Sequence, residues 1–210
     1  QVIAKDVIAP SVGPDKRSLY YVERTSGRIM KSDLDGNGEE AVTAITVPEV
    51  FEGLWSPSKT KIALAYHEAG TVKRFIEATA TGTPSRFLPF GVTSVGWSPD
   101  GKRMAYLLPQ GDQVNVVTAS ENGTGARTVF STPVPDFTLA WLTNASILLT
   151  SRPSGLAPSL VLRLDTTTGR AEPLLVGTAG VVTLVLPDGS GFIFSRSSPD
   201  GSAATLQLHS

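Results

Sequence analysis

The sequence predicts an all-β fold made of repeated units, each with four antiparallel strands. One pattern, an apolar run followed by a turn and a second apolar run, recurs along the 210 residues every 42 to 44 residues. The runs are short, rich in β-branched residues and bounded by turn residues, in line with the high content of Gly (20) and Pro (15). No segment of about ten residues has the 3.6-residue periodicity of an amphipathic helix.

The repeats become clear when the copies are aligned on a Trp position, which is occupied by Val12, Trp55, Trp97, Trp141 and Val185. The copies read SVGPDKRSLYYVE from Ser11, LWSPSKTKIALAY from Leu54, GWSPDGKRMAYLL from Gly96, AWLTNASILLTS from Ala140 and LVLPDGSGFIFSR from Leu184. Five copies at almost constant spacing indicate one structural unit that is used five times.

The third copy shows the expected elements of a unit in order. Its expected strands are 92–97, 102–108, 113–120 and 127–130, joined by turns at 98–101, 109–112 and 121–126. In the first turn Pro99 pre-sets φ, and Gly101 takes the left-handed position. The second and fourth copies divide in the same way.

Apolar residues occupy both faces of the second strand in this copy. Met104, Tyr106 and Leu108 alternate with Ala105 and Leu107. A four-stranded sheet cannot bury two apolar faces alone, whereas sheets stacked around an axis cover one another. We therefore predict a β-propeller of four-stranded antiparallel blades, with about five blades in this chain and the Trp residues packed between neighbouring blades.

Residues 1–210 are predicted to form a single propeller domain. The repeats span 7–49, 50–91, 92–135, 136–179 and 180–210 plus 1–6. The last copy has three strands, and Gln1–Asp6 has the right length to supply a fourth, which would close a five-bladed ring. The alternative is that the chain is a segment of a larger propeller of roughly six to eight blades. An open ring would leave two apolar blade faces exposed.

At these repeats the sequence resembles the TolB-type, WD-like propeller family of bacterial periplasmic and surface proteins. The family pattern W-S-P-D-G-K-x-[ILM]-A-[FY] is matched fully by Trp97–Tyr106, and by Trp55–Leu64 with Ser58-Lys59 in place of Asp-Gly. The last copy keeps Pro187-Asp188-Gly189. The resemblance covers nearly the whole chain and implies a propeller located outside the cytoplasm, in the periplasm or at the cell surface. Its members include interaction modules, gating domains of peptidases and surface binding proteins, so it implies no single function.

The composition excludes several classes of partner and site. The net charge is −1, from 18 basic and 19 acidic residues, which gives no electrostatic basis for binding nucleic acid. The absence of Cys excludes disulfides, thiolate nucleophiles and Cys-based metal sites. No apolar run approaches the ~20 residues of a membrane span. We therefore expect no nucleic-acid partner and no membrane span in this chain.

The sequence contains no catalytic constellation. The two histidines are His67 and His209, whereas a catalytic triad needs a His together with a carboxylate and an activated Ser. Ser98 lies in GWSPD, which lacks the final Gly of a nucleophile elbow and belongs to the repeated turn. We therefore predict that the chain is not an enzyme and needs no cofactor.

The best metal candidate is the stretch DLDGNGEE, which supplies Asp33, Asp35 and Asn37 with Gly38 at the sixth position. This is how an EF-hand calcium loop begins, but the twelfth position is Ala44 instead of the bidentate Glu. We interpret the stretch as a tight connection between strands, with a weak Ca²⁺ site as the alternative.

Basic residues recur in or beside the equivalent turns, at Lys59, Lys61, Lys102 and Arg103. They predict a basic rim on one face, which we interpret as a solvated surface.

The favoured function is a non-catalytic scaffold that binds a protein partner. One alternative is a lectin-like propeller that binds glycans or small ligands, and another is the gating propeller of a peptidase whose catalytic domain lies outside this chain. A lectin would carry equivalent sites in every copy, but the loops HEAGT, LPQGDQ, SRPSGLAPS and SSPDGS all differ. Function is therefore expected where the copies disagree.

Overall fold

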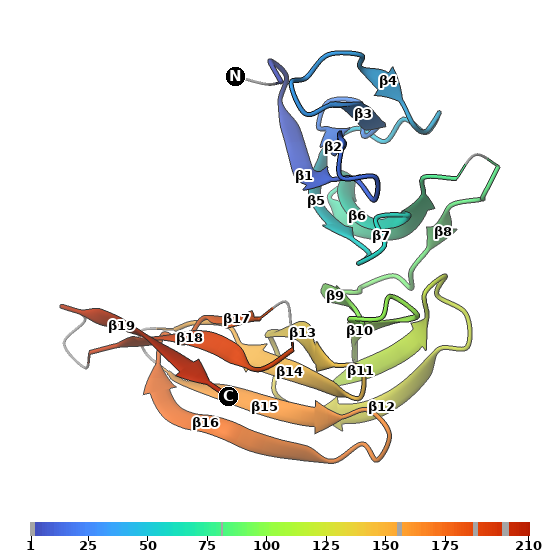
Figure 1. Cartoon of the computed structure of the whole chain (residues 1–210). Coiled ribbons are helices and arrows are strands. Elements are labelled where there is room, and N and C mark those ends of the chain that lie inside the picture. Colours follow the sequence, from blue (N-terminus) through green and yellow to red (C-terminus); the bar gives the residue numbers. More distant parts are fainter. Residues whose placement is uncertain (1–2, 81, 155–156, 187–188, 199–201) are drawn as a thin grey trace. The chain divides into compact units, whose positions relative to one another are not determined.

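The computed structural model of the chain describes residues 3–80, 82–154, 157–186, 189–198 and 202–210. These residues form strands and turns, and the strands make five antiparallel sheets (Figure 1). Four sheets have four strands and one has three, which confirms the predicted all-β blades. Among the described residues no helix is long and apolar enough to cross a membrane.

The chain packs as two compact units, of which the first, Gln1–Val92, holds two blades. In each blade the order of the strands in the sheet follows their order in the chain. The first blade consists of β1 (Val7–Val12), β2 (Ser18–Glu23), β3 (Ile29–Asp33) and β4 (Glu40–Ala41), and the second of β5 (Val50–Trp55), β6 (Lys61–Glu68), β7 (Thr71–Ala78) and β8 (Arg86–Phe87).

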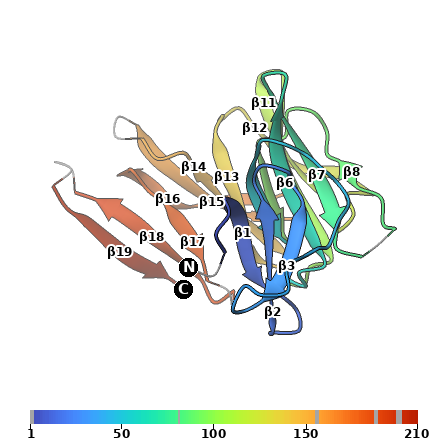
Figure 2. The same ribbon diagram turned by 90° about the horizontal axis from the view of Figure 1, so that it is seen from above.

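The second unit, Thr93–Ser210, holds three blades. Within it β13 contacts both β9 and β17, so the first strands of successive blades lie side by side (Figure 1). Figure 2 shows the strands β13 to β19 of this unit from above. The strands are β9 (Ser94–Trp97), β10 (Arg103–Gln110), β11 (Gln113–Ser120), β12 (Arg127–Thr132), β13 (Phe137–Thr143), β14 (Ser146–Ser151), β15 (Pro158–Asp165), β16 (Ala171–Ala179), β17 (Thr183–Val185), β18 (Phe192–Ser197) and β19 (Ala204–His209).

The strands of the third blade lie close to their predicted positions, with one informative difference. The strand expected at 113–120 is β11, but β10 continues through Pro109 and Gln110, which had been expected in the turn. Gln110 still pairs with Gln113, so the hairpin closes with Gly111 and Asp112 alone. Gly111 has a φ of 57°, which suits the tight two-residue turns that match the twist of a hairpin.

The turn after the Trp position has the same backbone hydrogen bonds in four blades. The N–H of its first residue donates to the carbonyl five residues later, in the pairs Gly13–Ser18, Ser56–Lys61, Ser98–Arg103 and Leu186–Gly191. The fourth residue has a positive φ in each case: 57° at Lys16, 59° at Lys59, 70° at Gly101 and 72° at Gly189. The predicted left-handed Gly101 is therefore confirmed, while Pro187 and Asp188 of the last copy lie outside the described residues.

The Asp of the motif caps this turn. Asp100 Oδ1 accepts hydrogen bonds from Ser98 Oγ at 2.6 Å and from the N–H of Lys102 at 3.1 Å, and the bond from Ser98 lowers the pKa of Asp100. In the first blade the hydroxyl of Ser18 and two backbone N–H groups lower the pKa of Asp15 to about 2. The motif therefore stabilises the turn through an ionised carboxylate.

Trp55 and Trp141 join their blade to the preceding one. The indole N–H of Trp55 donates to the carbonyl of Ala9 in β1 at 2.7 Å, and that of Trp141 donates to the carbonyl of Gly96 in β9 at 3.1 Å. Tyr20 packs edge-on against Trp55, and the Arg103 guanidinium lies 5.1 Å over the ring of Trp141. These contacts confirm the predicted packing of Trp between blades for Trp55 and Trp141.

The hydrophobic core consists of layers between successive sheets. One layer combines Ala105 and Leu107 of the third blade with Leu139, Ile147 and other apolar side chains of the fourth. Further layers lie between the first and second blades and between the fourth and fifth. At Gly96 an added Cβ would lie 2.7 Å from Leu139 Cδ2, so a larger residue at this position would require the Leu139 side chain of the next blade to move.

The fifth blade has an exposed apolar face. Leu184 pairs in register with Ile193, which pairs with Leu208, and the side chains of Leu184, Leu206 and Leu208 are 68%, 77% and 62% exposed. Residues 3–6 lie in no strand: the Asp6 carbonyl accepts from the N–H of Arg24, and Lys5 pairs with Glu39 in the first blade. Closure of the ring through Gln1–Asp6, and the single domain with these repeat boundaries, stay predictions.

Replacing Trp141 by Phe tests the contact between blades. The variant keeps an aromatic ring but removes the N–H that reaches Gly96, and the free energy of unfolding is expected to fall by about 1–2 kcal/mol. Urea unfolding followed by circular dichroism measures it. An unchanged unfolding midpoint would show that this hydrogen bond contributes nothing to stability.

The left-handed turn position gives a pair of substitutions with opposite expected effects. Lys59→Gly relieves the strain of a side chain at positive φ and should raise stability by about 0.5–1 kcal/mol, whereas Gly101→Ala introduces that strain and should lower stability by a similar amount. Thermal unfolding of both variants measures the difference. Shifts of the same sign in both would contradict the equivalence of the two turns.

Candidate functional site

The two edges of a blade carry different kinds of turn. In a sheet whose antiparallel strands pair in chain order, all strands run between two ends of the sheet, which are here called its edges. The turns after the first and third strands lie at one of these edges. The turn after the second strand lies at the other edge, beside the connection to the next blade. The first edge carries the repeated turn after the Trp position. The second edge, here called the variable edge, carries the loops that differ from copy to copy.

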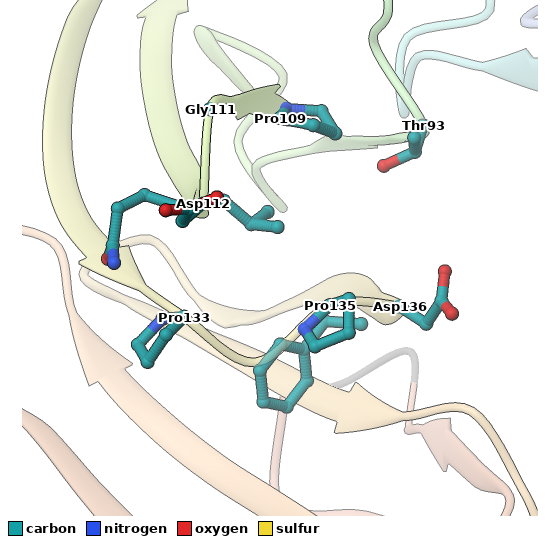
Figure 3. A pocket seen from close by; sticks show the side chains of 10 residues that line it. Thr93, Pro109, Gly111, Asp112, Pro133, Pro135 and Asp136 are labelled. Carbon is teal, nitrogen blue, oxygen red and sulfur yellow. The ribbon is translucent and has the colours of Figure 1, made fainter.

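The variable edge of the third blade contains a cleft of about 410 Å³. One wall is the end of the β10–β11 hairpin, with Pro109 and Asp112, and the other is the connection between β12 and β13, with Pro133, Pro135 and Asp136 (Figure 3). Two largely buried side chains, Val114 and Phe137, also line the cleft. This volume falls within the range of small-ligand pockets.

The backbone on both sides of the cleft is constrained. Proline rings fix φ at Pro109, Pro133 and Pro135. Asp136 has a φ of 58°, and its carbonyl accepts a hydrogen bond from the N–H of Arg152 at 2.8 Å. Glu49, which directly precedes the first strand of the second blade, has a φ of 60° and accepts a hydrogen bond from the N–H of His67, so this backbone conformation recurs between blades.

The sequence pointed to one wall of this cleft and missed the other. Asp112 lies in LPQGDQ, one of the loops in which the copies differ. Asp136, which directly follows the run Pro133-Val134-Pro135, was not predicted from the sequence. Two prolines so close together exclude regular pairing and indicate a rigid exposed connection, and this signal could have identified the second wall.

The structure places the predicted metal residues in a tight turn. Asp33 is the last residue of β3, and its Oδ1 accepts hydrogen bonds from the N–H groups of Asp35 at 3.0 Å and Asn37 at 2.7 Å. The carboxylate of Asp33 therefore holds the loop, as the turn interpretation requires. Within the described ranges no three His, Asp or Glu side chains form a cluster that could hold a metal ion. Binding of Ca²⁺ by Asp33, Asp35 and Asn37 stays a prediction.

The other residues singled out in the sequence have structural contacts. His67 stacks on Phe51 with ring centroids 4.5 Å apart, and His209 stacks on Phe192 at 4.9 Å. The hydroxyl of Ser98 bonds to Asp100 within the repeated turn. Arg103, expected in a basic rim, instead packs over Trp141 of the next blade and donates to the carbonyl of Asn144.

A second cavity, of about 260 Å³ in the first unit, contains a buried carboxyl group. Glu77 of β7 is only 5% exposed, and its Oε2 accepts a hydrogen bond from Ser85 Oγ at 2.5 Å. Burial raises the pKa of Glu77 more than the bond from Ser85 lowers it. The buried carboxyl of Glu77 could not be predicted from the sequence, because its burial depends on the side chains that pack around β7.

Two exposed aromatic rings lie beside a third hollow in the first unit. Phe87 and Phe90 are 61% and 74% exposed, and they line a depression of about 300 Å³ together with Lys73 and Arg74. Large exposed apolar side chains that gather in one place are typical of contact surfaces.

The stacked blades, the adjoining first strands and the Trp contacts define a β-propeller protein. No family model and no curated protein matches the sequence. The fold is that of TolB-type propellers. It is similar to the putative TolB from Agrobacterium tumefaciens, with a TM-score of 0.68 and 18% identity over 98% of this chain and 77% of that one. TolB from Acinetobacter baumannii has a TM-score of 0.57 and 18% identity over 98% of this chain and 55% of that one.

An enzyme is among the similar structures as well. The acylaminoacyl peptidase from Pyrococcus horikoshii has a TM-score of 0.67 and 12% identity over 97% of this chain. The chain spans 38% of that peptidase. At these identities the likeness concerns the fold.

Replacing Glu77 by Gln tests the buried carboxyl. A raised folded-state pKa favours the protonated form, so the contribution of Glu77 to stability is present below its ordinary pKa of 4.5 and is lost as the pH rises through the raised value. The Glu77→Gln variant should therefore match the wild type in acid and exceed its free energy of unfolding at neutral and higher pH. Denaturant unfolding at a series of pH values measures this.

The exposed carboxylate of Glu172 provides the control for this series. The difference in free energy of unfolding between Glu172→Gln and the wild type should be the same at every pH of the series. If the difference between Glu77→Gln and the wild type were also the same at every pH, the raised pKa of Glu77 would be contradicted.

Proposed function

We propose that the chain is a non-catalytic propeller scaffold that binds a protein partner at the variable edge of its third blade. The observation that carries this proposal is the rigid cleft at that edge. It lies where the copies differ, between a two-residue hairpin and a proline-rich connection. Repeated loops maintain the fold, whereas loops that vary on a constant scaffold are where binding residues concentrate.

The polar groups of the repeated turns support the same division of roles. Ser98 and Asp100 form hydrogen bonds with each other and with the backbone of the turn, and Asp15 accepts equivalent hydrogen bonds in the first blade. Side chains engaged in this way hold the fold. The exposed pair Phe87 and Phe90 adds an apolar surface of the kind that proteins bind. The resemblance to TolB-type proteins supports a location outside the cytoplasm.

A second candidate is a propeller that accompanies a catalytic domain. It is favoured by the similarity to the acylaminoacyl peptidase, of which this chain matches 38%. The sequence of the complete gene tests it: a hydrolase domain next to residues 1 or 210 would replace the scaffold proposal. Glycan binding stays a prediction, which a glycan array tests.

Site-specific photo-crosslinking tests the proposed scaffold. A benzoylphenylalanine introduced at Gln113, which lines the cleft, is compared with one at Lys102, an exposed residue of the repeated turn. In cells that express the protein naturally, irradiation should produce a discrete adduct with one protein from position 113 and none from position 102. Equal adducts from both positions, or none from either, would contradict binding at the variable edge.

A further inference from the structure

We propose that Asn37 is a site of spontaneous deamidation and backbone isomerisation, whereas Asn122, which is also followed by Gly, is protected by the fold. The inference goes beyond the proposed function, because it concerns a covalent modification of the first blade. It rests on the different hydrogen bonds and exposure of the two Asn-Gly pairs, Asn37-Gly38 and Asn122-Gly123.

Deamidation of Asn requires a side chain that can rotate and an accessible backbone nitrogen after it. Hydroxide removes the proton from this nitrogen, which attacks Cγ of the Asn side chain. A cyclic succinimide forms as the Cγ–Nδ2 bond breaks, and protonation of the leaving nitrogen to ammonia regenerates hydroxide. Water then opens either carbonyl of the ring, which yields aspartate or isoaspartate. Asn is thermolabile for this reason, and a following Gly favours the attack because it has no Cβ to hinder the approach.

The first pair meets both requirements. Asn37 and Gly38 are exposed, and a Cβ added at Gly38 would meet nothing within 4 Å. Within the described part of the chain, neither the N–H of Gly38 nor the side-chain amide of Asn37 forms a hydrogen bond. The side chain of Asn37 can therefore turn toward the Gly38 nitrogen without breaking a hydrogen bond.

The second pair is held by hydrogen bonds on both reacting groups. Asn122 Oδ1 accepts hydrogen bonds from Ser120 Oγ at 2.6 Å and from Thr124 Oγ1 at 2.8 Å. The backbone N–H of Thr124 also donates to it, at 3.3 Å. The N–H of Gly123 donates to the carbonyl of Ser120 at 2.9 Å. Attack on Cγ requires these bonds to break, and each bond that breaks raises the barrier of the reaction.

Modification of Asn37 acts on the turn between β3 and β4. Isoaspartate places one additional methylene group in the main chain directly after position 37. Before this point, the N–H of Asn37 donates to Asp33 Oδ1 at 2.7 Å, and its carbonyl accepts from the N–H of Asp33 at 2.9 Å. After it, Glu39 accepts hydrogen bonds from Lys5 Nζ at 2.7 Å and from the Tyr21 hydroxyl. We expect the longer main chain to weaken one of these two sets of bonds.

Incubation of the whole chain in mildly alkaline buffer, followed by tryptic digestion and mass spectrometry, tests the inference. Trypsin separates the two pairs into the peptides 32–59 and 104–127. In the folded chain, the mass increase that accompanies exchange of NH₂ for OH should appear at Asn37 about tenfold or more faster than at Asn122. In the chain held unfolded in guanidinium chloride the two rates should become similar, because both pairs are Asn-Gly and no fold protects either.

Matched variants locate the protection. Ser120→Ala with Thr124→Ala removes the two hydroxyl donors to Asn122 and should speed its reaction several-fold, by about the contribution of these bonds, without changing the rate at Asn37. Asn37→Gln should abolish the early mass increase in 32–59 and leave Asn122 unchanged. Equal rates at the two pairs in the folded chain, a faster reaction at Asn122, or no acceleration in the double variant would each overturn the inference.

A comparison of the products tests the effect on the turn. Chromatography isolates the isoaspartate form, and Asn37→Asp supplies the same charge on an ordinary backbone. The isoaspartate form should unfold at a lower denaturant concentration than Asn37→Asp, because only its main chain is longer. Equal unfolding midpoints would overturn the assigned effect on the turn.

Discussion

The structure depends on one kind of contact between blades: the indole N–H of a Trp donates to a carbonyl in the first strand of the preceding blade. Trp55 reaches Ala9, and Trp141 reaches Gly96. A blade has apolar residues on both faces, so it is stable only when its neighbours cover them. The Trp ring fills the space between first strands, and its N–H fixes how one sheet is placed on the next. The close approach explains the glycine at position 96, where a Cβ would meet Leu139.

This contact separates the two edges of the blades. The turn directly after the Trp position contains the Ser, the Asp and the left-handed residue that close it, and Asp100 additionally bonds through its N–H to Asn144 of the next blade. Residues at that edge are therefore constrained by the fold. At the opposite edge the loops differ between the copies, and the cleft with Asp112 and Asp136 lies there.

The acidic side chains also differ in their electrostatic environment. The carboxylates that the repeated turn uses, Asp15 and Asp100, have lowered pKa values because hydrogen bonds within the turn favour the charged form. Glu77 is the opposite case, since burial favours its neutral form and raises its pKa. Asp112 and Asp136, which line the cleft, are exposed, and within the described residues neither takes part in an ion pair.

The sequence by itself determined the unit of the fold. The spacing of Trp55, Trp97 and Trp141 predicts the number of blades, and the alternation in 104–108 predicts that both faces are covered, because periodicity and turn chemistry are local properties. The tertiary structure alone decided the contacts between distant residues. It placed the half-buried Arg103 over Trp141, buried Glu77 beside Ser85, and placed Asp112 and Asp136 on the two walls of one cleft. Each of these depends on tertiary packing, which a local sequence pattern does not specify.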